Sequence, residues 1–395
     1  MGRRRSGRQA ERHPRRRHDV EGLRGVAVLA VLLFHAGVPG LDGGYVGVDV
    51  FFVLSGFLIT GLLWAELSGT GRLSLLAFWA RRARRLLPAS VLVLVVTAGA
   101  ASALLSPLRA RSVLGDAVAS ALYAANHRFA AASTDYLADT GAPSPLLHYW
   151  SLGVEEQFYV VWPLLVVLSA RLARGRRAPR AVATSLVLAL AATSFAWCSL
   201  LTVRSQPWAF FSLPSRAWEL AAGGAVALAV PLLRRMPAAV AVVLGWAGML
   251  ALGLAVRALG PETAFPGTAA LLPVLGAVAV VGAGCRPTRH GAQRLLDRAP
   301  LRWAGRLSYS WYLWHWPVLV LAAEVAGPLS LLTRLALVGA SGLLAAVTLA
   351  VLEDPVRRSA LLARRPALGL AGAGALTAAT AAAAVSAVAL LPALG

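Results

Sequence analysis

Apolar segments long enough to cross a bilayer recur along almost the whole chain. A helical crossing needs about 20 apolar residues, and short polar connections separate the segments that reach this length. The segments that we expect to span run over residues 20–38, 48–67 and 87–105, and others begin near residues 152, 181, 216, 238, 268, 307, 329 and 367. The pattern predicts an all-α fold, a polytopic transmembrane bundle of about 11 helices.

Clusters of arginine between the spans predict the orientation of the chain. The clusters lie at residues 2–18, 72–85, 171–180, 234–235, 286–306 and 357–365, which is every second connection. Because positively charged connections stay in the cytoplasm, we expect a multi-pass protein of the inner or plasma membrane. Its N-terminus is predicted to be cytoplasmic and its C-terminus extracytoplasmic.

The segment at residues 112–129 does not fit this alternation as a crossing. The span before it leaves the cytoplasm, and the span that begins near Leu152 must also start outside, because it ends in the cluster at 171–180. We therefore predict a re-entrant or interfacial helix, whose exposed backbone needs cover from protein or from a water-filled cavity. The alternative is that this segment crosses and a later one does not.

Composition agrees with a membrane protein and argues against other classes. The chain is 58% hydrophobic and 14% charged, whereas a soluble domain carries about 25% charged residues. A net charge of +21 is typical of nucleic-acid binding, but the arginines alternate with the spans, so we expect no nucleic-acid partner. Cys198 and Cys285 fall in different spans and lack metal-ligand spacing, so we expect neither a disulfide nor a metal site.

The first predicted span carries two ionisable residues, Arg24 and His35. They are eleven positions apart, so they project almost to one helix face and lie roughly 16 Å apart along its axis. Ionisable groups within a span usually face a cavity or a partner, which makes both residues catalytic candidates. His35 suits proton transfer, and Arg24 suits binding of an anion or a carbonyl group. The alternative is an Arg24 that snorkels to the interface and a hydrogen-bonded, structural His35.

The second predicted span adds an acid and a hydroxyl near its start. Asp49 is a catalytic candidate that could pair with Arg24 or orient His35, although an acid at a helix N-terminus is also favoured by the helix dipole. Ser55 is a candidate substrate-binding residue, although Ser55 and Gly56 together also suit close helix contact.

Arginines in the second cluster, at residues 72–85, suggest a phosphate site. Arg82 and Arg85 are one helical turn apart and could clamp the phosphates of a coenzyme A donor. Anchoring of the span by positive charge explains them equally.

A carboxylate pair, Glu155 and Glu156, opens the span that begins near Leu152. The two acids are catalytic candidates, although acids in a first helical turn are also favoured by the dipole. For His315, which lies in an aromatic pattern typical of a membrane interface, we favour a structural role. The remaining candidates for substrate binding are His148, Trp150 and Glu219.

Five motifs in chain order resemble those of acyltransferase family 3, which are bacterial membrane O-acyltransferases that modify lipopolysaccharide, peptidoglycan and other glycans. The motifs are Arg24 and His35 with ten residues between them, and residues 43–57, 82–88, 150–159 and 312–317. The resemblance covers about residues 19–358. It implies a ten-span acyltransferase domain at 19–358, after a basic cytoplasmic leader at 1–18 and before a linker and an additional span at 359–395.

The resemblance also implies the donor and the residues that handle it. Acyl-coenzyme A, commonly acetyl-coenzyme A, binds from the cytoplasmic side in this family. Arg24 and His35 match the intramembrane Arg-His motif, and Arg82 and Arg85 match the cytoplasmic Arg-x-x-Arg motif. Many sugar-modifying members add a span and a periplasmic domain with a serine nucleophile. This chain has the span and ends at Gly395, which leaves open the acceptor and whether a separate extracytoplasmic transferase completes the reaction.

We therefore hypothesise an enzyme of the acyltransferase class. An acyl group, with acetyl expected, would pass from cytoplasmic acyl-coenzyme A to a hydroxyl of a glycan or another envelope or secreted acceptor. His35 would act as general base or as transient acyl carrier, and Arg24 or a nearby group would stabilise the oxyanion. The alternatives are a transporter or flippase of the envelope glycan pathway, which intramembrane charges would also suit, and a structural or sensory membrane protein.

Overall fold

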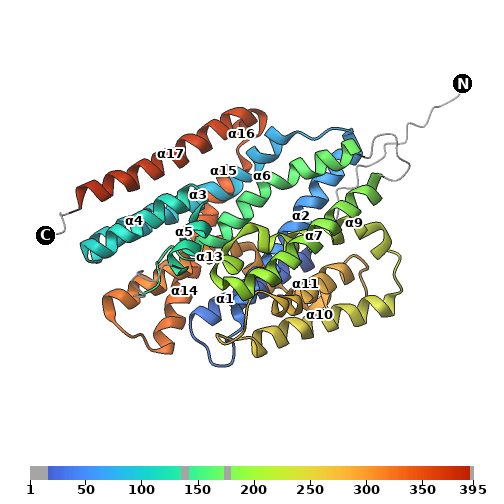
Figure 1. Cartoon of the computed structure of the whole chain (residues 1–395), viewed down its shortest axis with the longest axis horizontal. Helices are drawn as coiled ribbons and strands as arrows, with labels where there is room; N and C mark the ends of the chain where they lie inside the picture. The colour runs from blue at the N-terminus through green and yellow to red at the C-terminus, as the bar shows by residue number, and fades with distance from the viewer. Residues whose placement is uncertain (1–16, 135–141, 173–178, 392–395) are drawn as a thin grey trace, which may run out of the picture.

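The computed structural model describes residues 17–134, 142–172 and 179–391. In these ranges the chain forms helices and no strand, which confirms the predicted all-α bundle. The arginine cluster at 2–18 lies almost entirely outside the described residues, and so does most of the cluster at 171–180. Most of the long helices run roughly along one axis of the molecule (Figure 1).

Ten long helices form the body of the bundle: α1 (His18–His35), α2 (Gly47–Thr70), α3 (Leu75–Leu104), α6 (Tyr149–Leu172), α7 (Pro179–Arg204), α9 (Leu213–Leu233), α10 (Ala238–Ala258), α13 (Ala299–Ala326), α14 (Leu331–Thr348) and α17 (Pro366–Leu390) among the described residues. Shorter helices join them: α4 (Pro107–Ala121), α5 (Ala125–Thr134), α8 (Gln206–Phe211), α11 (Leu271–Ala283), α12 (Gln293–Leu296), α15 (Asp354–Arg358) and α16 (Ala360–Arg364). Two 3₁₀ turns, η1 (Gly44–Val46) and η2 (Thr268–Ala270), precede α2 and α11, and a π-helical turn, η3 (Leu349–Glu353), follows α14.

Within the described ranges, eight helices are long and apolar enough to cross a membrane. They correspond to α2, α3, α6, α7, α9, α10, α14 and α17, some of them extended by the short helices beside them. A count of about 11 spans also requires α1, α11 and α13, which are shorter or more polar and fall outside this set. The count of about 11 therefore stays a prediction.

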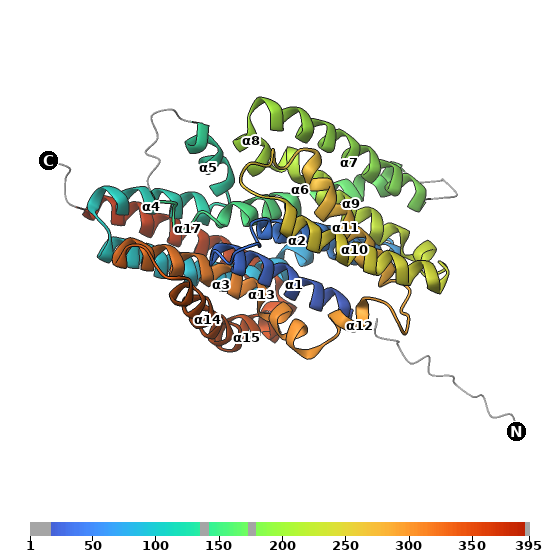
Figure 2. The same ribbon diagram turned by 90° about the horizontal axis from the view of Figure 1, so that it is seen from below.

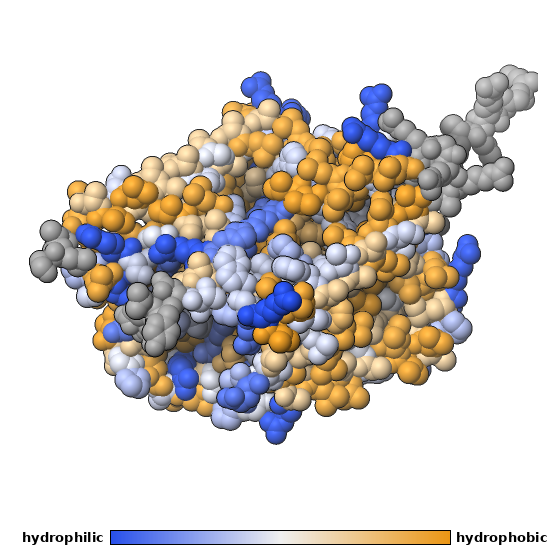
Figure 3. Space-filling view, in the orientation of Figure 1, coloured by the Kyte–Doolittle hydropathy of each residue, from blue (hydrophilic) through white to orange (hydrophobic). Residues whose placement is uncertain are grey.

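The surface of the bundle agrees with a membrane location. Large apolar side chains are exposed on many helices; Val203 is 88% exposed and Leu343 is 72% exposed. Figure 3 shows that hydrophobic residues cover much of one face, with hydrophilic residues along a central band and at the periphery. An apolar surface of this extent needs an apolar solvent, which lipid provides.

Helix α1 lies inside the bundle and contacts α2 and α13 (Figures 1 and 2). Helix α2 in turn packs along α9 at very short range. A Cβ atom at Gly56 would lie 1.7 Å from the Leu220 carbonyl oxygen, and one at Gly223 would lie 1.9 Å from the Val53 carbonyl oxygen. The close helix contact expected at Gly56 is therefore present, and it sets the spacing of the helices that carry Asp49 and Arg216.

The prediction of one helix at residues 112–129 was wrong. The chain forms α4 and α5 with a break at residues 122–124, where Tyr123 adopts a φ of 54°. Helix α4 has 15 residues and a length of about 22 Å, too short to cross a bilayer. It begins beside the end of α13, where Arg109 pairs with Glu324 at 2.7 Å, and it packs against α3 and α17. This agrees with a re-entrant or interfacial helix covered by protein.

The packing of α2 on α9 leads to a first prediction. Gly56→Ala should lower the free energy of unfolding by about 1–3 kcal/mol, because the new methyl group collides with backbone that cannot move aside. Thermal unfolding of the purified protein in detergent measures the effect. Gly61→Ala on the same helix is the control, since its Cβ atom would lie 3.9 Å from the Ala227 methyl group. Equal stability of the two variants would contradict this account of the packing.

Candidate active site

Two adjoining cavities lie in the centre of the bundle. The inner cavity is lined by Arg24, Ser55, Arg82, Arg85, Glu155, Tyr159 and Ser308, among other residues, and has a volume of about 70 Å³. The outer cavity is lined by His35, Tyr45, Asp49, His148, Trp150, Arg216 and Trp316, among others, and has a volume of about 280 Å³. Val48 and Tyr312 line both cavities, so only a thin wall of side chains separates them.

His35 ends α1 and contacts a second histidine. Its Nδ1 atom lies 2.9 Å from Nε2 of His315, and Nδ1 of His315 lies 2.7 Å from the carbonyl oxygen of Tyr312. A carbonyl oxygen only accepts, so Nδ1 of His315 carries a hydrogen, and in a neutral ring Nε2 is then an acceptor. Nδ1 of His35 must therefore be the donor between the two rings.

This chain of hydrogen bonds leaves Nε2 of His35 with a free lone pair. The ring is held in place by Trp316, whose centroid lies 4.5 Å away, as well as by His315. A neutral imidazole with one nitrogen fixed as donor presents the other as a base. Since His35 lines the outer cavity, the arrangement can take a proton from a group bound there.

Arg24 faces the inner cavity, so it does not share a cavity with His35. Its Nε and Nη2 atoms donate to the hydroxyl of Ser308, at 3.2 and 2.8 Å. Both residues thus face protein-lined space, as the sequence predicted, but at different depths of the bundle. The oxyanion role expected of Arg24 stays a prediction.

A polar network joins three helices at the inner cavity. Ser55 donates to Oε1 of Glu155 at 2.8 Å, and the Tyr159 hydroxyl donates to Oε2 of Glu155 at 3.1 Å. The guanidinium of Arg82 lies over the Tyr159 ring, 4.0 Å from its centroid. These contacts bring together Ser55, Arg82 and Glu155, which the sequence had singled out separately. Glu156 lines neither cavity.

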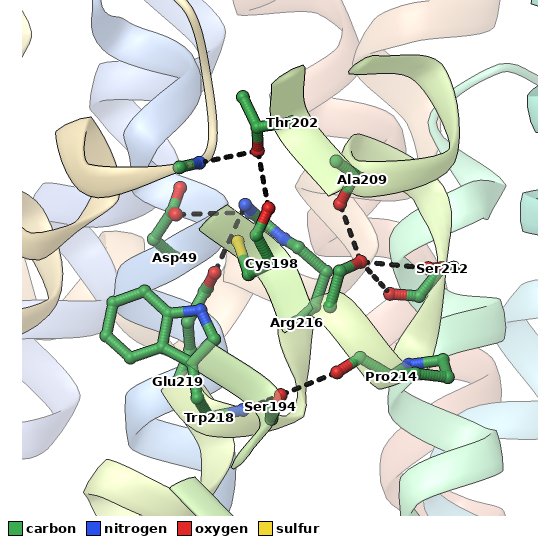
Figure 4. A network of polar contacts seen from close by, with 12 residues as sticks. Asp49, Ser194, Cys198, Thr202, Ala209, Ser212, Pro214, Arg216, Trp218 and Glu219 are labelled. Carbon is green, nitrogen blue, oxygen red and sulfur yellow. Dashed lines mark hydrogen bonds and ion pairs between the residues drawn. The ribbon is translucent and has the colours of Figure 1, made fainter. Parts of the chain in front are cut away.

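A buried ion cluster forms one wall of the outer cavity (Figure 4). Arg216 pairs with Asp49 and with Glu219, each at 3.1 Å, and the three side chains are at most 1% exposed. The expectation that Asp49 pairs with Arg24 or orients His35 was therefore wrong. Glu219, expected to bind substrate, lines neither cavity and instead supports Arg216.

The surroundings of Arg216 explain how a charge is held at this depth. Aromatic rings enclose its guanidinium at 5.4–5.8 Å, from Phe52, Trp150, Phe210 and Phe265. Nearby, Ser194 donates to the Pro214 carbonyl at 2.6 Å and accepts from the Trp218 amide, which fastens the first turn of α9 to α7 (Figure 4). The cluster joins α2 to α9 and fixes one wall of the outer cavity.

The outer cavity also contains the other two candidates for substrate binding, His148 and Trp150. Nε2 of His148 lies 3.0 Å from the Leu313 carbonyl oxygen and must donate to it. Nδ1 of His148 is then an acceptor, and it has no hydrogen-bond partner among the described residues.

Sequence reasoning gave no functional role to four residues of the site. Ser308 and Tyr159 had no distinguishing signal, since hydroxyls are common in membrane helices. Arg216 and His315 did have one, because each is an ionisable group within an apolar helix. His315 was assigned a structural role because of the many aromatic residues around it. In the described ranges, no group of histidine, cysteine or acidic residues is placed to hold a metal ion, and Cys198 and Cys285 are free thiols.

The ion cluster leads to a second prediction. Arg216→Met should destabilise the protein by about 3–5 kcal/mol, because two buried carboxylates lose their counter-charge. The triple variant Arg216→Met/Asp49→Asn/Glu219→Gln removes all three charges and should recover most of the loss. Thermal unfolding in detergent compares the two variants with the unmodified protein. A single variant as stable as the unmodified protein would show that the cluster does not hold α2 and α9 together.

The chain is similar to three bacterial proteins with assigned names. It is 31% identical over 357 residues to the peptidoglycan O-acetyltransferase OatA of Listeria monocytogenes, which covers 87% of the chain and 56% of the relative. It is 34% identical over 327 residues to YrhL of Bacillus subtilis, and this match covers 79% of the chain and 50% of the relative. It is 28% identical over 355 residues to the O-acetyltransferase OatA of Staphylococcus aureus, and this match covers 87% of the chain and 58% of the relative. The chain thus spans about half the length of the curated relatives it matches. No solved structure matches it.

A family profile described as an acyltransferase domain matches residues 17–352, which is most of the chain. The match includes the helices that line the two cavities, from α1 to α13. It confirms the resemblance drawn from the five motifs and the class of enzyme that they imply. The chain belongs to this family of membrane acyltransferases.

Proposed function

We propose that the protein transfers an acetyl group from cytoplasmic acetyl-coenzyme A to a hydroxyl of a cell-wall glycan, with His35 as general base. The observation that carries the proposal is the contact of His35 with His315, which leaves Nε2 of His35 as the acceptor nitrogen of a ring that lines the outer cavity. His315 and the Tyr312 carbonyl hold the other nitrogen of His35 as a donor. The proposal keeps the predicted orientation, with the N-terminus in the cytoplasm.

The inner cavity suits the reactive end of the donor. Its volume of about 70 Å³ is too small for a nucleotide and is on the order of the thioester end of the donor. Arg82 and Arg85 line this cavity on α3, and Arg24 lines it on α1. Because Val48 and Tyr312 line both cavities, a movement of these side chains would open a path for the thioester from the inner cavity toward His35.

The outer cavity suits a sugar acceptor. Flat aromatic rings line it, including those of Phe34, Trp150, Phe210 and Trp316, and such rings pack well on the apolar face of a sugar. Its volume of about 280 Å³ is on the order of a single sugar unit. The relatives named as peptidoglycan O-acetyltransferases support a glycan of the cell wall as the acceptor.

The chemical step then follows from the position of the base. Nε2 of His35 takes the proton of the acceptor hydroxyl while the oxygen attacks the thioester carbonyl and forms the new C–O bond. As the tetrahedral intermediate collapses, the C–S bond breaks, and the leaving thiolate takes the proton from the His35 imidazolium. The Tyr45 hydroxyl lines the same cavity and has no hydrogen-bond partner among the described residues, so it can donate to the oxyanion.

A third prediction tests the base. His35→Ala should reduce acetyl transfer by about 10²–10⁴-fold, measured in proteoliposomes with labelled acetyl-coenzyme A and a soluble glycan acceptor. His290→Ala is the matched control, because His290 is exposed and lines neither cavity. Retained transfer in a folded His35→Ala variant would remove His35 from the mechanism. Glycan movement without thioester consumption by the unmodified protein would favour a flippase.

A fourth prediction tests His315 as the residue that positions His35. His315→Phe removes the acceptor for Nδ1 of His35 and should lower kcat at least about tenfold with little change in KM. His315→Gln supplies an amide oxygen that can accept the same hydrogen bond, and it should recover part of the loss. Steady-state kinetics of both folded variants measure the difference. Equal losses in the two variants would show that the hydrogen bond is not what the reaction needs.

A further inference from the structure

A third cavity lies beside the inner one and is lined by charged groups. Six arginines converge on it, namely Arg17, Arg24, Arg85, Arg306, Arg357 and Arg358. They come from the start of α1, from α3 and α13, and from α15, and the cavity has a volume of about 350 Å³. We call this space the arginine vestibule. In the predicted orientation it lies at the cytoplasmic end of the bundle.

The vestibule adjoins the inner cavity through two of its own residues. Arg24 and Arg85 line both spaces. The guanidinium of Arg24 is held on the inner side by the Ser308 hydroxyl. A ligand that fills the vestibule would therefore lie within reach of a narrow extension into the inner cavity.

The charge of the vestibule is unbalanced. Glu21 and Asp354 are its acidic lining residues, and Arg17 also pairs with Asp19 at 2.7 Å, so six guanidinium groups face three carboxylates among the described residues. Among the described residues, neither Arg85 nor Arg306 has a carboxylate within ion-pair distance. The positive-inside rule accounts for arginine at the cytoplasmic surface. It does not account for six arginines around one cavity, where mutual repulsion costs stability unless an anion is bound.

A break in helical geometry brings one side of the vestibule into place. Helix α14 continues into the π-helical turn η3, and α15 follows directly. A π turn changes the direction in which the following side chains point and often marks a functional site. Here Asp354 accepts hydrogen bonds from Arg357 and Arg358, at 2.5 and 2.6 Å, which holds both guanidinium groups at the cavity.

We propose that the vestibule binds the 3′-phosphorylated adenosine diphosphate portion of coenzyme A. This part of the donor carries about four negative charges at neutral pH, opposite in sign to the excess charge of the lining. The inference rests on the proposed function for the choice of donor and assigns its phosphates to residues beyond Arg82 and Arg85. Guanidinium groups are the preferred partners of phosphate because they bind it in a bidentate manner.

The volumes of the two spaces support a donor whose nucleotide lies in the vestibule and whose pantetheine arm extends into the inner cavity. The vestibule, at about 350 Å³, is several times larger than the inner cavity, at about 70 Å³. A nucleotide requires the larger space, and the thioester end of the pantetheine arm suits the smaller one. Arg82 stacks on Tyr159 and lines only the inner cavity, so it would meet the arm or its amide groups. Arg306 and Arg358, which line only the vestibule, would meet the phosphates.

Binding of the nucleotide portion alone tests the inference without any acyl transfer. The full chain in phosphatidylcholine nanodiscs is titrated with adenosine 3′,5′-bisphosphate and, for comparison, with adenosine monophosphate. We expect the bisphosphate to bind more tightly, and Arg306→Gln/Arg358→Gln to weaken its binding about tenfold or more. Arg364→Gln, an exposed arginine of α16 outside the vestibule, is the matched control and should bind normally. Equal binding by the double variant and the control would overturn the inference.

A comparison of donors adds a kinetic readout. The ratio of kcat/KM for acetyl-coenzyme A to that for acetyl-pantetheine should fall about tenfold in Arg306→Gln/Arg358→Gln, because only the first donor carries the phosphates. An unchanged ratio would overturn the inference while the proposed function stands. Binding of the bisphosphate that depends on these arginines, without acetyl transfer from either donor, would support the vestibule and overturn the proposed function.

The alternative ligand for the vestibule is the phosphate of an anionic lipid headgroup. The titration is repeated in nanodiscs that contain phosphatidylglycerol. If the vestibule binds the nucleotide, the bisphosphate should still bind and should still depend on Arg306 and Arg358. If the lipid instead blocks the bisphosphate and stabilises the unmodified protein but not the double variant, a headgroup occupies the vestibule and the inference is wrong.

Discussion

An ionisable side chain inside a lipid-embedded bundle needs a partner or a wet cavity, and this constraint organises the interior of the protein. Arg216 meets it with two carboxylates and an enclosure of aromatic rings, and so joins α2 to α9. Arg24 meets it with the Ser308 hydroxyl on α13. His35 satisfies this constraint with His315, which also lies on α13. Because these contacts cross between helices, they hold the core helices in the one arrangement that keeps two cavities open.

The separation of the cavities gives the polar groups of α1 different roles. Arg24 and His35 lie on one helix but open into different spaces. Under the proposed function, the cationic group would act where an anionic donor enters and the base where an acceptor binds. Val48 and Tyr312 form the wall between these spaces. Such a wall would keep water from the donor thioester until the acceptor is in place, which suits transfer rather than hydrolysis.

Interruptions of helical geometry recur at the edges of these spaces. Helix α9 begins beside the outer cavity, where Ser194 fastens its first turn, and the π turn η3 precedes the arginines of the vestibule. A break at residues 122–124 ends α4 before it could cross a bilayer. Irregular backbone at membrane depth is tolerated only where protein or water covers it, so these breaks lie where the bundle is packed or hollow.

The sequence by itself determined the helical class, most of the spans and the family, because bilayer thickness sets the length of an apolar segment and local motifs carry the family pattern. It also picked out side chains that line a cavity, including Arg24, His35, Arg82, Glu155 and His148. Only the tertiary structure decided the partners: Asp49 with Arg216, His35 with His315, and Glu156 outside both cavities. Pairing depends on which helices touch and on how each is rotated about its axis. Those quantities arise from packing between segments far apart in the chain, which no local pattern contains.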